Sequence, residues 1–521
     1  MGAPSGRAGG KRRRSLRGVL SMALPLLALA LVVPIAQAAL GELTDLLALG
    51  QAGGQTPAKA PVQRRAEPPL RATPRADCLP GSNEEPGIQG RVPAGAASEG
   101  LSCNVSLVSR QGSSGGFKVW RYIDRQGNEC AYYDTALLFP LNALKLSGSS
   151  LGVAVLDMSD PANPVQTATL TEPAMLTPHE SLSLNKKRGL LAAVLGDPAT
   201  HPGLVSIYDL SADCRRPVLQ STELVARYGH ESGFSRDGKT FYATGTSVAA
   251  ITAIDVTNPK RPDPIWHGNI VSHGMSLSDD GDRAYIADPI AGELMILDTS
   301  EIQARARDPK TREISRLTWK SVSIPQNTAP FSVRGKPYLL EFDEYTAGLS
   351  GREGGRDEVG AARIIDISND RRPRVISNLR LKVNQPAEHR AASQDPGAES
   401  PVQGYAAHYC AVPTAVDPKV VACSFIASGL RVFDISELKS PKEIAYFVPP
   451  TQARVENGLM PSAYAMSKPA FAPGRREVWF TDGTTGFYNV RVDKRVWPRR
   501  KTCRAQDSKR KRRPVRCRRA S

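Results

Sequence analysis

The chain has 521 residues, 40% of them hydrophobic and 23% charged, which is the composition of a globular protein rather than of a collagen, a fully disordered chain or a polytopic membrane protein. Its net charge of +17 is concentrated at the two ends, because residues 1–38 carry +6 and residues 491–521 carry +13, so the body is nearly neutral. The basic pI therefore does not indicate a nucleic-acid groove built into the fold.

The N-terminus has the three parts of a secretory signal peptide. A basic stretch that includes Lys11 and Arg17 precedes an apolar run over residues 18–35, and Ala36 and Ala38 supply the small residues of a cleavage site. We therefore expect residues 1–38 to be removed and the protein to be secreted or held at the cell envelope, with no transmembrane domain after cleavage. The alternative is an uncleaved anchor, since about 18 apolar residues can just span a bilayer.

Two segments outside the predicted core are expected to be disordered on composition. Residues 39–100 are rich in Pro, Gly, Ala and Arg and poor in aromatic and β-branched residues, which predicts a linker that cannot bury enough apolar surface to fold. Residues 493–521 form a basic tail. Outside the cytoplasm this tail would be attracted to anionic envelope surfaces, and no specific nucleic-acid partner is expected.

All eight cysteines lie after the predicted cleavage site, so export would allow disulfides. Cys410 and Cys423 are equidistant from the centre of a predicted hairpin, which predicts a bridge between facing strands. Cys503 could pair with Cys517 in the tail, and Cys103 with Cys130. The sequence contains no CxxC or Cys/His spacing typical of a structural zinc site.

From about residue 101 the chain repeats one pattern, in which a strand ends in Asp, Ser or Thr mostly follows two residues later, and Pro usually comes next. The carboxylate can cap the backbone of the turn, and Pro suits a position that needs no ladder donor. Two strands precede and one follows this strand in each unit of about 45 residues, which is the pattern of a β-propeller blade. The repeated strand-end residues are Asp157, Asp209, Asp255, Asp298, Asp366 and Asp434.

The third strands, VAVLD, VSIYD, LMILD and RVFDI, resemble those of LVIVD-repeat propellers, and FSRDGKTFYATG resembles the YVTN type of repeat. The resemblance covers roughly residues 101–492 and implies an all-β, seven-bladed propeller of four-stranded antiparallel blades. It implies little about activity, because propellers host many unrelated functions.

Ring closure can be predicted from the strand count. The last blade, at about 463–492, has three strands, whereas residues 103–110 form a strand before the first blade begins. We expect this N-terminal strand to complete the last blade and so remove two open sheet edges. Six or eight blades remain the alternatives, because the first copy, at about 117–170, is the least regular.

Four of the seven histidines begin the first strand of a blade, the strand that lines a propeller's channel. They are His179, His230, His273 and His408. In the fifth and seventh blades the equivalent positions are assigned to Pro330 with Phe331 and to Ser462 with Tyr464. His201, His267 and His389 are expected to lie on the surface.

Carboxylates accompany this histidine ring. Glu180 and Glu231 directly follow two of the histidines, and acidic residues end second strands on the same face, at Asp134, Asp197, Asp288, Asp343, Glu344 and Asp482. Such a set could hold a divalent transition metal, with His179, His230, His273 and His408 as the ligands and Glu180 or Glu231 as general base. The other interpretation is structural, because repeats can copy a polar residue that only hydrogen-bonds the neighbouring blade.

Three long loops, at about 135–150, 345–360 and 383–403, are expected on the histidine face, where they would form either a rim over the channel mouth or floppy excursions. Two functions follow from the whole pattern. The favoured one is a non-catalytic binding scaffold at the envelope, attached there by the basic tail, with a polymer, protein or small molecule at the channel face. The other is a metal-dependent oxidoreductase or hydrolase. Selenium-binding-protein propellers resemble the second arrangement, but the cysteine expected from that comparison is missing.

Overall fold

The computed structural model describes residues 54–64, 67–136, 151–196, 203–246, 248–344, 359–398, 404–451 and 462–498, with the backbone of 501–502 and 518–519. All of these belong to one compact unit, Gly53–Ser521. The predicted signal peptide lies outside the described residues. No helix in the described part of the chain is long and apolar enough to cross a membrane.

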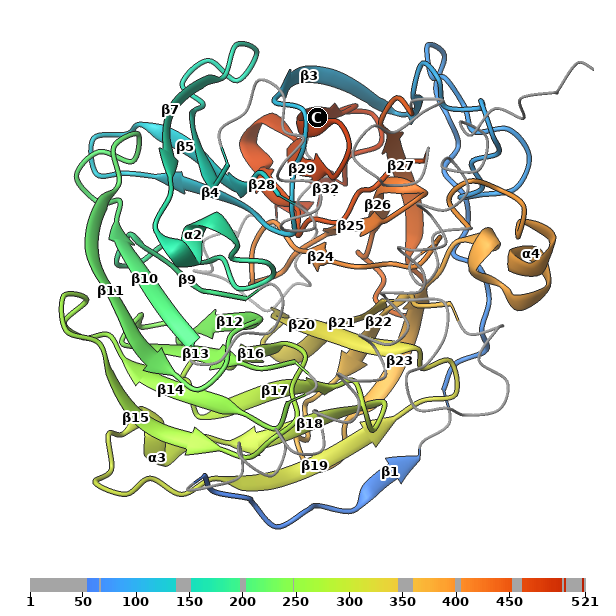
Figure 1. Cartoon of the computed structure of the whole chain (residues 1–521). Helices are drawn as coiled ribbons and strands as arrows, with labels where there is room; N and C mark the ends of the chain where they lie inside the picture. The colour runs from blue at the N-terminus through green and yellow to red at the C-terminus, as the bar shows by residue number, and fades with distance from the viewer. Residues whose placement is uncertain are drawn as a thin grey trace, which may run out of the picture. The chain divides into compact units, whose positions relative to one another are not determined.

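Seven antiparallel sheets form the seven blades of a propeller, confirming the predicted fold class (Figure 1). The first three blades are β4 (Val119–Ile123), β5 (Glu129–Asp134), β6 (Val153–Asp157) and β7 (Val165–Leu170); β8 (Ser183–Asn185), β9 (Leu190–Val194), β10 (Gly203–Asp209) and β11 (Val218–Ala226); and β12 (Glu231–Phe234), β13 (Thr240–Thr244), β14 (Ile251–Asp255) and β15 (Asp263–Gly268).

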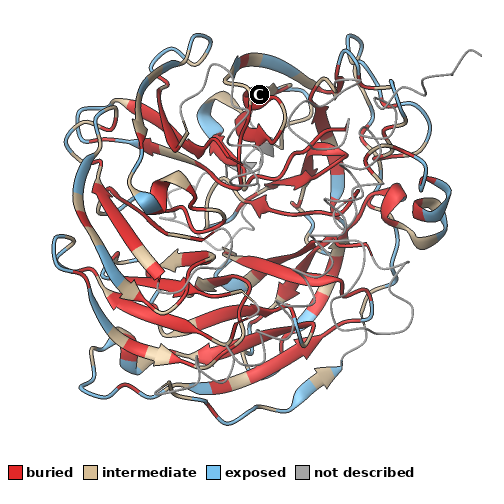
Figure 2. Ribbon diagram, viewed as in Figure 1, coloured by how far each residue is buried: buried red, intermediate tan, exposed pale blue. Residues whose placement is uncertain are grey.

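The next two blades are β16 (Met275–Leu277), β17 (Arg283–Asp288), β18 (Glu293–Asp298) and β19 (Arg312–Thr318); and β20 (Ile324–Val333), β21 (Lys336–Glu344), β22 (Ala362–Asp366) and β23 (Arg374–Leu379). The last two are β24 (Cys410–Ala411), β25 (Val420–Phe425), β26 (Gly429–Asp434) and β27 (Lys442–Val448); and β28 (Ala470–Ala472), β29 (Glu477–Asp482), β30 (Gly486–Val492) and β3 (Val105–Gln111). Figure 2 shows that the inner strands are buried and that exposure increases toward the outer strands and turns.

The repeated Asp residues cap turns, as predicted. At the end of each third strand of the first six blades, the Asp carboxylate accepts a hydrogen bond from the backbone N–H two residues later, for example from Ser159 to Asp157 at 2.9 Å and from Ser436 to Asp434 at 2.7 Å. The Asp therefore ends each strand by satisfying the donor that the sheet no longer pairs.

The ring closes as the strand count predicted, because β3 pairs antiparallel with β30 in the last blade. The closing strand begins two residues later than expected. Leu101–Cys103 (β2) instead pairs with β27 as a fifth strand of the sixth blade. Between β2 and β3, Asn104 takes a left-handed conformation, φ 58°, and its side chain donates to the carbonyls of Asp77 and Ile444. This residue turns the chain from one blade to the next.

The described residues between 54 and 100 are not a flexible linker, so that expectation is wrong for this stretch. Val62–Arg64 (β1) pairs in parallel with β19, at the outer edge of the fourth blade (Figure 1). Farther along, Glu85 is buried and forms an ion pair with Arg431 of β26 at 2.7 Å. Composition misled because a few small apolar residues suffice here. Ala76, Val92 and Ala97 are buried in the hydrophobic core shared with the fifth and sixth blades, and polar contacts and a disulfide add to this.

Three disulfides lie in the described part of the chain. The predicted Cys410–Cys423 bridge is confirmed, with the two residues facing each other across β24 and β25. The suggested Cys103–Cys130 pair is wrong, since Cys78 pairs with Cys103 and Cys130 with Cys214. The suggested Cys503–Cys517 pair lies outside the described residues. Three disulfides indicate an oxidising compartment outside the cytoplasm.

The polypeptide between the fifth and sixth blades is partly helical. Pro386–Ala391 forms a short helix, α4, after a 3₁₀ turn at Lys382–Asn384. Arg91 of the N-terminal segment forms an ion pair with Asp395 at 2.8 Å, just after this helix. His389 of α4 is buried, contrary to the expectation of a surface position, and its ring meets that of Tyr405 edge-on. In the C-terminal tail, Lys501–Thr502 (β31) pairs with Arg518–Arg519 (β32), so these four residues are not irregular as expected.

Candidate metal centre

The four predicted histidines converge. His179, His230 and His273 are consecutive neighbours in the channel, with ring centroids 4.4 Å apart for the first pair and 5.1 Å for the second. The ring of Phe117, from the entrance to the first blade, lies 4.2 Å from that of His179 and 5.5 Å from that of His408. A phenylalanine thus closes the histidine ring between the second and sixth blades.

Glu180 is the hub of the centre. Its Oε2 lies 3.4 Å from His230 Nε2 and 3.4 Å from His273 Nδ1, and its Oε1 lies 3.1 Å from His408 Nε2. The carboxylate is 2% exposed, so it meets three imidazoles away from bulk water. The sequence indicates Glu180 as a neighbour of the histidines and a candidate base, and it gives no sign of a central ligand, because that position depends on how the blades pack.

Glu344 supplies a second carboxylate from the end of β21 in the fifth blade. Its Oε1 lies 3.1 Å from His273 Nε2 and its Oε2 lies 3.2 Å from His408 Nε2. Glu344 was predicted to lie on this face but not to be a ligand. Five side chains from the second, third, fourth, fifth and sixth blades therefore share one buried point.

Backbone conformation and contacts orient three of the ring nitrogens. His179 has φ 48°, a left-handed conformation that costs a non-glycine residue of order 1–3 kcal/mol and that tends to occur at functional sites. His408 Nδ1 lies 2.6 Å from the carbonyl oxygen of Met466, and His230 Nδ1 lies 3.3 Å from that of Gly196. With Nδ1 placed to donate to a carbonyl, Nε2 of both histidines faces Glu180, and Nε2 of His408 would have to release its proton before it could donate an electron pair to a metal.

Burial and neighbouring charges shift the pKa values of the histidines in opposite directions. Burial alone would lower the pKa of His408, but the contacts with Glu180 and Glu344 raise it to about 10. Burial likewise would raise the pKa of Glu180, yet His273, His230 and His408 together hold it well below its usual range. His179, by contrast, has its pKa lowered by burial and by the neighbouring His230, which keeps that imidazole neutral.

A second layer lies directly beneath the ring. Glu231 is fully buried, forms an ion pair with Lys118 and accepts a hydrogen bond from the hydroxyl of Tyr409. Gln326 donates from Nε2 to Glu180 Oε1 at 2.7 Å and to Tyr409 Oη at 3.1 Å, and so connects the two layers.

Gln326 shows where the sequence assignment for the fifth blade was wrong. Pro330 and Phe331 were assigned to the channel mouth, but β20 begins at Ile324 and brings Gln326 there instead. The strand is ten residues long, and the motif His-Glu-Ser or His-Gly that marks other blades is missing from it. In the seventh blade, Ser462 and Tyr464 precede the channel position, and the backbone of Met466 contacts His408.

The other predicted strand-end acids hold the fold together. Three of them accept hydrogen bonds from backbone N–H groups, Asp134 from Phe117 at 3.0 Å, Asp482 from Tyr464 at 2.6 Å and Asp288 from Ile290 at 3.1 Å. The fourth, Asp343, pairs with the guanidinium of Arg363 at 2.8 Å. Asp197 lies outside the described residues, as does His201. His267 is partly buried in β15, where its Nδ1 lies 3.1 Å from Thr252 Oγ1, so it is not a fully exposed residue.

The donor set fits a divalent transition metal. Three overlapping groups of ligand atoms, each within 4.8 Å of one another, comprise His179, Glu180 and His230; Glu180, Glu344 and His408; and Glu180, Glu231 and His273. Glu180 Oε2, His273 Nδ1 and His408 Nε2 are buried and have no well-aligned hydrogen bond within the described structure, since their partners are only one another and neighbouring imidazole or carboxylate atoms at 3.1–3.4 Å. Buried polar atoms without hydrogen bonds are costly, and a cation bound by imidazole and carboxylate would satisfy all three.

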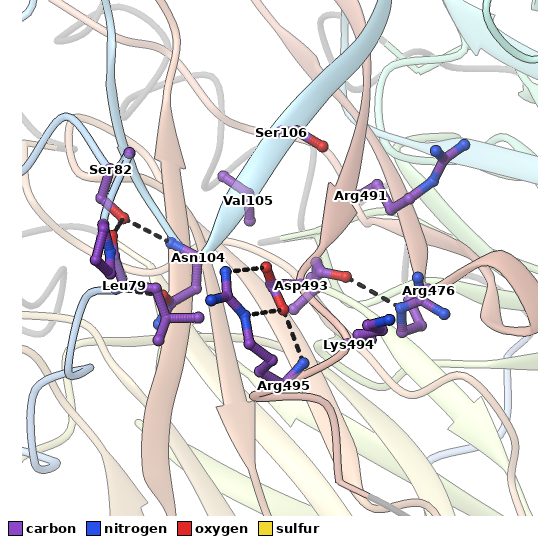
Figure 3. A pocket seen from close by; sticks show the side chains of 13 residues that line it. Leu79, Ser82, Asn104, Val105, Ser106, Arg476, Arg491, Asp493, Lys494 and Arg495 are labelled. Atoms are coloured by element: carbon purple, nitrogen blue, oxygen red, sulfur yellow. Dashed lines mark hydrogen bonds and ion pairs between the residues drawn. The ribbon is translucent and has the colours of Figure 1, made fainter.

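A separate pocket of about 560 Å³ lies at the junction where the N-terminal segment and the closing strand meet the seventh blade (Figure 3). Most of its charged lining residues are basic, namely Arg476, Arg491, Lys494 and Arg495, and its one carboxylate, Asp493, forms an ion pair with Arg495 at 2.8 Å. Arg491 is likewise paired with Glu477 at 2.7 Å. This pocket contains no group of acids, bases and nucleophiles that could carry a reaction.

No protein-family model matches the chain, and no curated protein matches its sequence. Solved structures do match. A putative 6-phosphogluconolactonase from Bacteroides fragilis is 12% identical, with 64% of this chain and 84% of that chain covered and a TM-score of 0.45.

The periplasmic gluconolactonase PpgL of Pseudomonas aeruginosa is 15% identical, with 66% and 96% covered and a TM-score of 0.44. The β-propeller domain of Cps50 (Swd1) from Myceliophteria thermophila is 14% identical, with 74% and 98% covered and a TM-score of 0.44. At such identities a likeness concerns the fold alone.

Proposed function

We propose that this protein is an exported metalloprotein that binds one divalent transition metal in the propeller channel and acts as a metal-dependent oxidoreductase or hydrolase. The observation that carries the proposal is the convergence of His230, His273 and His408 on Glu180, with Glu344 closing the same point. A merely structural polar ring would pair each residue with its neighbour and would not direct three imidazoles at one carboxylate.

The proposed ligands are the three imidazoles together with Glu180 and Glu344, and neutral His179 stands beside them. Mixed imidazole and carboxylate sets suit zinc, iron or manganese, and such a metal would act as a Lewis acid or activate a bound water. Glu231 is the candidate for moving a proton, because it lies one layer away and is held by Lys118 and Tyr409. Since His408 is protonated when no metal is bound, metal binding should strengthen as pH rises.

The test is elemental analysis of the mature protein, residues 39–521, exported by a bacterial host and purified without a histidine tag. We expect about one transition metal per chain, and less than about a tenth of that in Glu180→Gln, because the substitution removes the shared charge. Glu223→Gln, on the exposed outer strand β11, is the matched control and should keep its metal. Equal metal content in all three proteins would contradict the proposal and leave the binding scaffold as the function.

We further propose that the basic tail attaches the protein to anionic envelope surfaces, and that the propeller belongs to the LVIVD-repeat type. The tail proposal is supported by the net charge of +13 over residues 491–521. A chain ending at residue 498 should lose its association with phosphatidylglycerol vesicles at low salt, since attraction between a charge run and a charged surface carries the binding. Unchanged association of the shortened chain would contradict this role.

A further inference from the structure

A second cavity, of about 540 Å³, occupies the channel on the other side of the layer formed by Lys118, Glu231 and Tyr409. All seven blades contribute to its lining through their first strands or the residues next to them. Its inner end is formed by Lys118, Tyr409 and Lys468, and its outer end by the turns that follow the first strands of the second to fourth blades. None of the proposed metal ligands lines it.

The cavity carries an excess of positive charge. Five cationic side chains line it, against the single carboxylate of Asp279; they are Lys118, Lys186, Lys187, Arg236 and Lys468. Lys118 is paired with the buried Glu231, and Arg236 is paired with Asp279. Lys186, Lys187 and Lys468 form no ion pair within the described residues, so no carboxylate competes with a ligand for them. Burial, together with the nearby Lys186 and Lys118, lowers the pKa of Lys468 to about 7, and an anion beside it would favour its charged form.

Lys468 stands at the inner end with its ammonium over an aromatic face. Its Nζ lies 3.9 Å from the centroid of the Trp120 ring, and the Trp120 indole is fixed by a hydrogen bond of 2.8 Å to the carbonyl of Leu182. The side chain is partly buried. A cationic side chain that lines a cavity and has no carboxylate partner favours an anionic ligand.

The walls between the two ends combine apolar side chains with hydroxyl and amide groups, such as those of Ser232, Ser276 and Asn327. Met275, Phe234, Phe342 and Pro330 line them together with Trp120. A volume of this size is in the range that holds a small organic molecule, and a few polar groups at fixed positions in an apolar pocket orient such a ligand. Inorganic phosphate would match the charge but would leave these walls unused.

We propose that this cavity binds a small organic anion, with the carboxylate at Lys468 and the apolar body between the walls. The site is distinct from the metal centre and opens at the opposite end of the channel. Binding therefore does not require a metal, and the two proposals can fail separately.

The experiment measures the dissociation constants of 2-naphthoate, its neutral counterpart 2-naphthamide and inorganic phosphate by calorimetry, first with the protein as isolated and then after chelation. We expect 2-naphthoate to bind at least about 10-fold more tightly than 2-naphthamide, because a charge-assisted hydrogen bond is stronger than a neutral one. Tighter binding of phosphate than of naphthoate, or equal binding of naphthoate and naphthamide, would overturn the proposal.

Two variants locate the site. Lys468→Met keeps the apolar stem over Trp120 and should weaken 2-naphthoate binding about 10-fold while leaving 2-naphthamide binding nearly unchanged. Lys260→Met, in an exposed turn of the third blade, should change neither. Unchanged naphthoate affinity in Lys468→Met, or its loss on chelation of the wild-type protein, would show that the anion binds elsewhere and would contradict the assignment.

Discussion

At the scale of single residues, Glu180 shows how one position changes role between sequence and structure. In the sequence it follows His179 just as Glu231 follows His230, and both appear equally suited to be a base. In the structure Glu180 meets three imidazoles, whereas Glu231 meets Lys118 and Tyr409. The backbone at His179, with its positive φ, breaks the equivalence of the two copies.

Asp134 provides a residue-scale prediction about pH. Burial raises the pKa of its carboxyl to about 8, in spite of hydrogen bonds from backbone N–H groups that include that of Phe117. Because the pKa is higher in the folded state, burial of this carboxyl costs no ionisation energy below about pH 4, where it is protonated in both states. The free energy of unfolding then decreases as the pH rises toward 8, because only the unfolded state ionises readily.

In the wild-type protein this residue should lower the free energy of unfolding by up to about 1.4 kcal/mol per pH unit over that range. Asp134→Asn, which has no ionisable group there, should not show this decrease. The measurement is chemical denaturation at several pH values for both proteins. Asp160→Asn, whose carboxylate is exposed, serves as the control. Parallel pH profiles for the wild type and Asp134→Asn would contradict a raised pKa at this position.

At the scale of elements, the N-terminal segment is the main difference between expectation and structure. Its Pro- and Gly-rich composition predicted disorder, but polar side chains connect it to the sixth blade. Arg431 of β26 is fully buried and bridges Glu85 at 2.7 Å and Glu443 at 3.1 Å, with its guanidinium 4.4 Å from the centroid of the Tyr446 ring. No local sequence pattern could predict the contact between Glu85 and Arg431, because the two residues are 346 positions apart in the chain.

Glu85→Ala should lower the free energy of unfolding by roughly 3–5 kcal/mol, since it leaves a buried arginine with half of its compensation. Glu84→Ala is a closely matched control, because the neighbouring side chain is exposed. Denaturation followed by tryptophan fluorescence measures both. A similar effect of the two substitutions would show that the segment is not anchored by this ion pair.

The elements that sequence predicted well are those that repeat. The capping Asp at the end of the third strand identified the first six blades, and the unpaired strand before the first blade identified the closure. The fifth blade was predicted less well, because its first strand is long and has no histidine. Gln326 therefore escaped notice, although it is the residue that joins Glu180 to Tyr409.

At the scale of the whole molecule, the seven blades do what no single blade can. Residues in or next to the inner strands of the second to sixth blades contribute polar side chains, and ring closure brings these to a common axis. The histidines could be predicted because duplication placed them at equivalent positions, whereas the contribution of Glu344 depends on where β21 ends relative to the axis. The same closure leaves a metal-type ligand set at one end of the channel and a cationic cavity at the other.

The most direct test of the metal centre is a crystal structure of the exported protein, with diffraction data collected above and below the absorption edge of the metal that elemental analysis finds. We predict one strong anomalous peak within coordination distance of Glu180, His230, His273 and His408, and no peak at that position in Glu180→Gln. A metal bound elsewhere, or a centre in which Glu180 and the histidines keep their mutual contacts with no metal between them after incubation with zinc, iron and manganese, would contradict the account.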